Sequence, residues 1–462
     1  MINKNNKKEV MPTQKPDVRI KNFDEVELGY SDSEAVSEAN RCMGCKAKPC
    51  VSGCPVCIDI PGFIAKIKEN DPKSAYEIIN KSNPFPAICG RVCPQEKQCE
   101  ARCLRGKTGE PVAIGRLERY AADFERIHSE KNDDKIGYSN HKIAVVGSGP
   151  AGLTCASELS KLGFEVTVFE ALHKLGGVLA YGIPKFRLPH EILEYEIRKL
   201  KSSGIKFVSN VVIGKSLFVD DLFEDGYSAV YIATGAGLPK FMNIPGESFA
   251  GVYSANEFLT RVNLMNAHKE NYDTPLTKLG GVVVVGGGNV AMDAARCAMR
   301  AGAESVKIMY RRSEEEMPAR LAEICHAKEE NIEFMLLSNP VEICGNDGKV
   351  SKIKYQKMRL TEADVSGRKA VEPVSDEIYE INADTVIMAI GNGSNPVITE
   401  SDATIKCDNR GRIITKEGSS RTSRPFVYAG GDIVTGAATA IMAMGAGKKA
   451  AHEIFEDLKI KN

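Results

Sequence analysis

The chain of 462 residues has no tryptophan, few aromatic residues (6%) and no excess charge of either sign, because 61 basic residues balance 61 acidic ones. A formal net charge of zero gives no electrostatic reason to expect nucleic acid or an anionic membrane as a partner. No apolar run approaches the roughly 20 residues that span a bilayer, and the amino terminus lacks the apolar core of a secretory signal. We therefore expect a cytoplasmic protein with no nucleic-acid or membrane partner.

Cysteine, in contrast, is plentiful and unevenly placed. Nine of the 14 cysteines lie between Cys42 and Cys103. In a reducing compartment thiols stay reduced, so dense cysteines indicate metal binding rather than disulfides. The strings CMGCKAKPCVSGCPVC and CGRVCPQEKQCEARC contain no histidine and combine CxxC with Cx4C and Cx3CP. This spacing favours two [4Fe-4S] clusters over the alternative, zinc.

The ligand sets remain open at this level. Because a cysteine before proline serves the other cluster in two-cluster ferredoxins, Cys54 need not join the cysteines before it, and it could join the later ones, Cys93, Cys99 and Cys103. Cys42, Cys45 and Cys50 then lack a fourth ligand. The candidates are Cys57, Cys89 and a non-cysteine donor.

A predicted helix after Pro111, ending near His128, offers such a donor. Its apolar stripe is formed by Ile114, Leu117, Ala121 and Phe124, and Glu118 lies on the border of that stripe. Periodicity alone favours a solvated edge glutamate over a ligand. Cys57 and Cys89 can equally be buried small apolar residues.

The sequence GSGPAG follows the strand-like IAVV and opens a predicted helix. Glycines in this pattern permit a tight turn and a close approach of pyrophosphate to a helix amino terminus. Glu170, which ends the next strand, is placed to accept hydrogen bonds from ribose hydroxyls. The unit resembles an FAD fingerprint, with candidate residues Gly147, Gly149, Pro150, Ala151 and Gly152.

Two later segments support a flavin. TSRPFVYAGGD resembles a second FAD motif, in which Gly431 and Asp432 hold the ribityl-pyrophosphate portion, and ATG at 233–235 resembles the crossover between two dinucleotide domains. Gly177, within GGVLAYGIPKFRLP, is a further candidate. The alternative for Asp432 is a turn aspartate that caps the last helix.

A second unit of the same design reads VVVVGGGNVA, with Gly286, Gly288, Asn289 and Ala291 in its loop. Its second strand ends in Arg311 and Arg312 rather than in an acid. Because arginines bind a 2′-phosphate that a carboxylate would repel, this unit predicts NADP rather than NAD. The alternative is an arginine pair that is solvated or paired with nearby glutamates.

These patterns predict an α/β protein: a helical iron-sulfur domain followed by two Rossmann-like dinucleotide-binding domains, the FAD domain being interrupted by an inserted NADP domain. We expect domains at 1–140, at 141–277 with 385–462, and at 278–384. The charged string at 129–140 predicts a linker, and VEICGNDGKVSKIKYQKMRL predicts a hairpin or small antiparallel sheet.

With CMGCKAKPC, NPFPAICGRVCP, QCEARC and GGVLAYGIPKFRLP, the chain resembles the small chain of NADPH-dependent glutamate synthase, from about residue 20 to its end. It is also similar to the NADP-binding subunit of a bifurcating NADH-dependent ferredoxin:NADP oxidoreductase and to the amino-terminal half of dihydropyrimidine dehydrogenase. The resemblance implies FAD, NADP(H) and two [4Fe-4S] clusters, one with Cys42, Cys45, Cys50 and Glu118 as ligands and the other with Cys54, Cys93, Cys99 and Cys103.

The resemblance also implies a function, in which hydride passes from NADPH to FAD and single electrons pass on to the clusters. The cofactors carry the chemistry, so no catalytic side chain is expected. Glutamate formation would require a partner, an FMN-containing large chain. The alternative, a bifurcating enzyme, would require a small flavoprotein subunit or ferredoxin, and a redox-sensing scaffold without enzymatic activity is a third reading.

Overall fold

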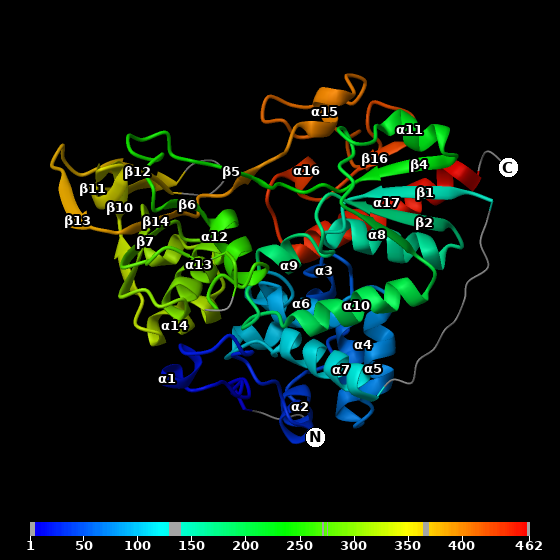
Figure 1. The fold of residues 1–462 in the computed structure, drawn as a ribbon. Coiled ribbons are helices and arrows are strands. Elements are labelled where there is room, and N and C mark those ends of the chain that lie inside the picture. The colour runs from blue at the N-terminus through cyan, green and yellow to red at the C-terminus, as the bar shows by residue number, and fades with distance from the viewer. Residues whose placement is uncertain (1–4, 129–139, 270–271, 275, 364–368, 460–462) are drawn as a thin grey trace.

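The computed structural model describes residues 5–128, 140–269, 272–274, 276–363 and 369–459. It has three units (Figure 1). The expected linker lies almost wholly outside the described residues. No helix among the described residues is both long enough and apolar enough to cross a membrane.

The amino-terminal unit is helical, and its longest helix, α7, covers residues Ile114–His128, as the apolar stripe predicts. Helix α6 packs along α7. Three short 3-10 turns follow α6 and carry the chain past the last two cysteines of the group. The other helices are α1 (Pro16–Arg19), α2 (Asp32–Ala39), α3 (Pro49–Ser52), α4 (Ile60–Lys68), α5 (Pro72–Asn80) and α6 (Pro86–Val92).

The second unit is built on a parallel sheet with strand order β16-β4-β1-β2-β3. Its strands are β1 (Lys142–Val146), β2 (Glu165–Glu170), β3 (Lys206–Ser209), β4 (Tyr227–Ile232) and β16 (Val427–Ala429). The chain leaves this sheet after β4 and returns to it only at β16, as an inserted domain requires. The associated helices are α8 (Pro150–Lys161), α9 (Val178–Tyr181), α10 (His190–Ser202), α11 (Val219–Glu224), α15 (Val397–Ser401), α16 (Asp432–Thr435) and α17 (Ala440–Lys459).

The inserted unit has its own parallel sheet, with strand order β6-β14-β7-β8-β9. The strands are β6 (Val252–Ser254), β7 (Gly281–Val285), β8 (Ser305–Tyr310), β9 (Glu333–Leu336) and β14 (Thr385–Met388), and the helices are α12 (Ala255–Asn263), α13 (Asn289–Arg300) and α14 (Leu321–Glu329). The segment 278–384 leaves out β6 and β14. We propose wider limits for this domain, set by the short pair of β5 (Leu238–Pro239) and β15 (Asn392–Gly393), where the chain passes between the two sheets.

The expected hairpin is confirmed. Strand β10 (Ser338–Asn346) pairs antiparallel with β11 (Lys349–Ala363), and β12 (Lys369–Pro373) and β13 (Tyr379–Asn382) pair with β11 as well. The two turn residues, Asp347 and Gly348, both have positive φ, 50° and 75°. That is the type I′ turn whose twist matches a two-residue hairpin.

The residues before α2 form a strap, 9–30, that reaches the inserted unit. The strap folds back on itself through the bridge of Thr13 with Glu27. At its tip Arg19 is buried, and its Nε donates to Oε1 of Glu330 beyond α14 at 2.8 Å. Burial alone would raise the pKa of Glu330. Hydrogen bonds from Arg300 and Arg296 of α13 nevertheless hold that pKa below its usual range. The strap is therefore anchored by a buried group of charges that neutralise one another.

Candidate functional site

The first glycine loop joins β1 to α8 and is too crowded for side chains. Gly147 has φ of 104°, and a Cβ there would lie 2.5 Å from the carbonyl oxygen of Ala233. A Cβ on Gly152 would lie 1.9 Å from the carbonyl oxygen of Gly147, whereas one on Gly149 would meet nothing within 4 Å. The loop is thus packed tightly against its own sheet and open at Gly149, next to Pro150 at the amino terminus of α8. Such a cradle fits a pyrophosphate.

Glu170, at the end of β2, is buried beside this loop. Its carboxylate accepts hydrogen bonds from the backbone N–H groups of Ser148 and Leu172, each at 2.9 Å. The side chain therefore braces the glycine loop directly. Accepting from a ribose hydroxyl would be an additional role for the same carboxylate.

The two other flavin candidates converge on the same loop. A Cβ on Gly177 would lie 2.9 Å from Cα of Gly149, and one on Gly431 would lie 2.9 Å from Cβ of Ala151. Burial raises the pKa of Asp432 to about 6, against the opposing effect of the Ala438 N–H that its Oδ1 accepts at 3.3 Å. Because Ala438 lies just before α17, this hydrogen bond resembles the helix cap that is the alternative role of Asp432. These segments fit FAD because they all meet at the first glycine loop.

The second glycine loop repeats the design between β7 and α13. A Cβ on Gly286 would lie 2.3 Å from the carbonyl oxygen of Ala389, and Gly288 precedes α13. Ala291, at the third position of the motif, is fully buried. Asn289 fixes the neighbouring segment, because its Oδ1 accepts from the N–H of Arg320 at 2.9 Å.

The two arginines after β8 do not act as a pair. Arg311 is exposed, whereas Arg312 is buried and its Nε donates to the carbonyl oxygen of Lys369 at 2.8 Å. Arg312 therefore holds the start of β12. Of the two, only Arg311 presents its side chain at the surface.

Four cysteines, Cys42, Cys45, Cys50 and Cys103, line one cavity of the helical unit, which we call site A. Apolar side chains, among them Met43 and Leu104, line most of the rest of it, and Arg105 lines it as well. Burial raises the pKa of Cys50 to about 11, and the neighbouring thiols of Cys103 and Cys42 add to that rise. Several thiolates become favourable side by side only when a cation lies between them. An iron-sulfur cluster meets that condition.

Site B consists of Cys54, Cys93, Cys99 and Glu118, all of them buried. Burial raises the pKa of Cys54 to about 11 and raises that of Cys99, and the carboxylate of Glu118 adds to the rise at both. Glu118 is only 5% exposed. This overturns the solvated-edge interpretation that periodicity favoured.

Asn83 orients this carboxyl group. Its Nδ2 donates to Oε1 of Glu118 at 2.7 Å, and its Oδ1 accepts from the N–H of Phe85 at 3.0 Å. Burial raises the pKa of Glu118 to about 8, and the bond from Asn83 offsets only part of that rise. A buried carboxyl group with one oxygen held fits a ligand that is completed by metal.

The two sets differ from those that the resemblance implies. Cys103 lies with Cys42, Cys45 and Cys50, whereas Glu118 lies with the set of Cys54. The reason is packing: α7 lies along α6 and brings Glu118 toward Cys93, while the 3-10 turn before Cys103 contacts α3. The inference that Cys54 separates from the three cysteines before it agrees with this grouping. Among the described residues, no three His, Cys, Asp or Glu side chains converge as they would on a single metal ion.

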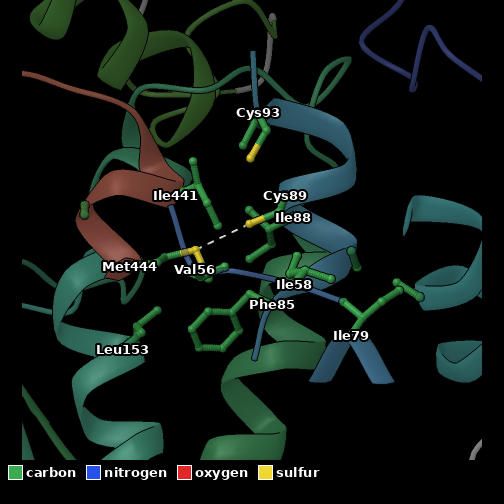
Figure 2. Close-up of a cluster of buried hydrophobic side chains, with 14 of the residues drawn as sticks. Val56, Ile58, Ile79, Phe85, Ile88, Cys89, Cys93, Leu153, Ile441 and Met444 are labelled. Atoms are coloured by element: carbon green, nitrogen blue, oxygen red, sulfur yellow. Dashed lines mark hydrogen bonds between the residues drawn. The ribbon is translucent and has the colours of Figure 1, made fainter. Parts of the chain in front are cut away.

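The two remaining cysteines of this region have different surroundings. Cys57 is exposed and has φ of 55°. Cys89 is fully buried, with its Sγ 3.4 Å from Sδ of Met444 and 3.7 Å from Oδ1 of Asn83. Figure 2 shows the side chain of Cys89 pointing from α6 toward Met444 of α17, with Cys93 nearby. Cys155 and Cys297 are buried within α8 and α13, as expected for helix-packing residues.

Site B adjoins the FAD-type unit. Helix α17 supplies Ile441 and Met444 to the apolar cluster that also contains Val56 and Cys89 (Figure 2). A Cβ on Gly445 of the same helix would lie 3.2 Å from the carbonyl oxygen of Pro55, directly after Cys54. The backbone beside site B is therefore packed against the unit that holds the first glycine loop.

Sequence reasoning missed two residues of the site. Asn83 begins the string NPFPAICGRVCP but has no spacing that marks it as a partner of Glu118. Ser148, inside the first glycine loop, donates its N–H to Glu170 and accepts the N–H of Gly176 on its Oγ at 3.0 Å. The position of Ser148 between two glycines was the available signal.

Comparison with known proteins agrees with this arrangement. Residues 19–130 match the family described as dihydropyrimidine dehydrogenase domain II, 4Fe-4S cluster, and residues 141–447 match the pyridine nucleotide-disulphide oxidoreductase family. The glutamate synthase (NADPH) small chain of Escherichia coli is 35% identical over 98% of this chain and 97% of its own length. The chain belongs to the glutamate synthase small-chain family. It is an NADPH-dependent oxidoreductase with FAD, [4Fe-4S] and NADP(H) as cofactors.

Two other relatives show how far the likeness extends. The NADP(+)-dependent formate dehydrogenase subunit beta of Moorella thermoacetica is 36% identical over 89% of this chain and 60% of its own length. FprA of Mycobacterium tuberculosis, solved in complex with NADPH, is 23% identical with a TM-score of 0.59 over 70% of this chain and 85% of its own. That structure shows the shared fold of the two dinucleotide-binding units. Names such as small chain and subunit beta indicate a partner subunit.

Proposed function

We propose that this chain is the electron-input chain of a glutamate synthase, passing electrons from NADPH through FAD to two [4Fe-4S] clusters, at sites B and A in that order. One observation carries the order. Site B is buried against the unit that holds the first glycine loop, whereas all four cysteines of site A are partly exposed. A route from a flavin toward a partner therefore meets site B first.

The ligands of the two clusters follow from the two sets. Site A would use four thiolates, and site B would use three thiolates with the carboxylate of Glu118. FAD, when bound, accepts a hydride and gives up its electrons one at a time. The role of the chain is to hold the cofactors, to keep water from site B and to tune potentials through burial and nearby charge. No side chain of this chain has to donate or accept a proton for that route.

The identity of the partner follows from the reaction and from the relatives, and not from particular residues of this chain. Formation of L-glutamate from glutamine and 2-oxoglutarate needs an amidotransferase and a reducing site, which we assign to an FMN-containing large chain. The Moorella relative, named as a formate dehydrogenase subunit, supports a second candidate. In it the same module would serve another acceptor, as in a bifurcating enzyme with a small flavoprotein subunit. A reducing compartment, the cytoplasm, suits both candidates because the thiols must stay reduced.

Anaerobic purification tests the cofactor content. We expect about eight irons and one FAD per chain. NADPH should bleach the flavin and then produce the signal of a reduced cluster in electron paramagnetic resonance. Four or fewer irons, or bound zinc, would contradict the two-cluster proposal. The protein that co-purifies distinguishes the two candidates, since an amidotransferase chain and a small flavoprotein point to different reactions.

The nucleotide preference has its own test. We expect Arg311→Glu to raise KM for NADPH by about tenfold or more and to leave KM for NADH nearly unchanged, because a bidentate bond to the 2′-phosphate is lost. Lys349→Glu, at an exposed lysine of the inserted unit, is a control for the change of charge. An equal effect of both variants on KM for NADPH would remove Arg311 from the binding site.

A further inference from the structure

A short segment of the inserted unit, 317–321, lies against the helical unit beside site B, and we call it the docking loop. The Nζ of Lys97 donates to three consecutive carbonyl oxygens of this loop, at 3.3, 2.9 and 3.4 Å. The last N–H of the loop donates to Oε1 of Glu96 at 3.2 Å. Both partners lie between Cys93 and Cys99, two members of site B. The inserted unit therefore contacts the segment that carries site B.

The docking loop is also joined to the second glycine loop. The N–H of Arg320 donates to Oδ1 of Asn289 at 2.9 Å, and the N–H of Ala319 donates to the carbonyl oxygen of Gly287 at 3.3 Å. The loop is therefore held from two sides, by the nucleotide loop and by the helical unit.

From this loop the side chain of Arg320 enters the helical unit. Its Nη1 donates to the carbonyl oxygen of Arg91, and its Nη2 donates to Oε1 of Gln95 at 3.2 Å, on either side of Cys93 along the chain. Both acceptors are neutral. The nearby carboxylate of Glu96 has its Oε2 3.9 Å from Nε of Arg320, which is too far for a hydrogen bond. That Nε is buried and has no hydrogen-bond partner among the described residues.

The positive charge of Arg320 is therefore buried without a bonded carboxylate. Among the described residues eight arginines are buried, and only Arg312 and Arg320 have no carboxylate within hydrogen-bond distance. Burying an unpaired charge is costly. The hydrogen bond with Cys89 and burial raise the pKa of Cys93, and the charge of Arg320 opposes that rise. The thiolates and the carboxylate of a loaded site B would supply the negative charge that Arg320 lacks.

We propose that Arg320, a charge supplied by the inserted unit, raises the reduction potential of the cluster at site B. The inference rests on the proposed function, because it requires a cluster there. A cation beside a cluster favours the reduced state, which carries one more negative charge. Site B then takes up a single electron more readily. If Arg320 only fastened the docking loop, its hydrogen bonds would matter and its charge would not.

The test uses the full chain with its cofactors in an anaerobic redox titration followed by electron paramagnetic resonance. The signal of site B is the one that Glu118→Ala alters. Arg320→Gln keeps an N–H donor and removes the charge. At a fixed potential we expect its ratio of reduced to oxidised cluster at site B to fall about tenfold or more, which is about 59 mV for one electron. The ratio at site A should stay within about twofold, and Arg320→Lys should keep the ratio at site B within about threefold, because the charge remains.

A second variant tests the opposite sign and decides the matter if Arg320→Gln fails to bind iron. Glu96→Gln removes a negative charge beside Arg320 and keeps an acceptor for the N–H of Leu321, so the ratio at site B should rise about twofold or more. The control is Lys328→Gln, an exposed lysine of α14 that pairs with Glu314, and it should change neither ratio.

Three results would overturn the role of Arg320. They are an unchanged ratio at site B in Arg320→Gln, an equal fall in Arg320→Gln and Arg320→Lys, and an unchanged or lower ratio in Glu96→Gln. Iron and FAD contents equal to those of the unaltered protein show that each variant is loaded. An unaltered protein without cluster signals would instead remove the proposed function.

Discussion

Sites A and B use nearly the same donor chemistry in opposite surroundings. Site A lines a cavity close to the surface, beside exposed Met43, whereas every member of site B is buried and α17 of the FAD-type unit packs beside it. Their loops also differ, because those of site A are basic while Glu118 adds a carboxylate to site B. Ligand type therefore does not determine which cluster faces a partner. The packing around each set does.

The carboxyl group in site B sharpens this difference. Without metal, Glu118 has a pKa of about 8 because it is buried, so it is largely protonated at neutral pH. Filling site B must therefore release the proton of a carboxyl group as well as those of three thiols, in a place that solvent hardly reaches.

The largest expected effect tests which cysteines share a cluster. Cys42→Ser with Cys103→Ser alters one site and should remove about four of about eight irons per FAD. Cys54→Ser with Cys103→Ser alters both sites and should remove nearly all of the iron. Iron and FAD analysis after anaerobic purification measures both outcomes. If the second pair kept about four irons and the first pair lost all, Cys103 would belong with Cys54.

The next effect concerns Glu118 alone. Glu118→Ala should abolish or shift the electron paramagnetic resonance signal of one cluster and spare the other. Asn83→Ala should shift the same signal less and destabilise the metal-free protein by about 1–3 kcal/mol, because a buried carboxyl group loses its donor. Glu125→Ala, on the same helix α7, is the control and should change neither signal. An unchanged spectrum for Glu118→Ala would leave Glu118 without a role as ligand.

A smaller effect appears when the metal is removed. In chelator-treated protein, iodoacetamide should label Cys50 before Cys54. Burial raises the pKa of both thiols to about 11, so their rates differ through access rather than through acidity. Exposed Cys57 and fully buried Cys155 set the fast and slow limits in the same mass-spectrometric measurement. Equal rates at Cys50 and Cys54 would remove the contrast between the sites.

The smallest effects belong to the two cysteines outside both sets. Cys57→Ser should change the free energy of unfolding by no more than about 0.5 kcal/mol, as expected of an exposed residue. Cys89→Ala should cost roughly 1–2 kcal/mol, because it opens a small cavity against Met444. Both variants should keep all of their iron, as measured by iron analysis beside a denaturation curve. Loss of iron from Cys57→Ser would instead make it a ligand.

Local patterns predicted much of this molecule. The two glycine loops, the helix after Pro111 and the hairpin within VEICGNDGKVSKIKYQKMRL are each determined by residues close in sequence, and the structure has them where they were expected. The α/β architecture with its interrupted first sheet follows from the order of those units. In each case the physical cause lies within a few turns or strands.

Features that depend on tertiary packing could not be predicted in this way. No spacing shows that α7 turns Glu118 toward Cys93, or that Cys103 returns to α3 across a long stretch of sequence. The separation of Arg311 from Arg312 depends on β12, far along the chain, which takes up Arg312. The polar segment before α2 has no apolar periodicity, yet the buried side chain of Arg19 anchors it to the inserted unit.

The strap binds the segment 9–30, which precedes the helical unit, to the inserted unit. Arg19 pairs with Glu330, so the inserted nicotinamide-type unit is completed by residues that are synthesised before it. Grafting this unit between relatives should therefore transfer residues 9–30 together with it. A chimera that exchanges only the inserted segment would lose the ion pair between Arg19 and Glu330. No domain limit in the sequence marks that contact.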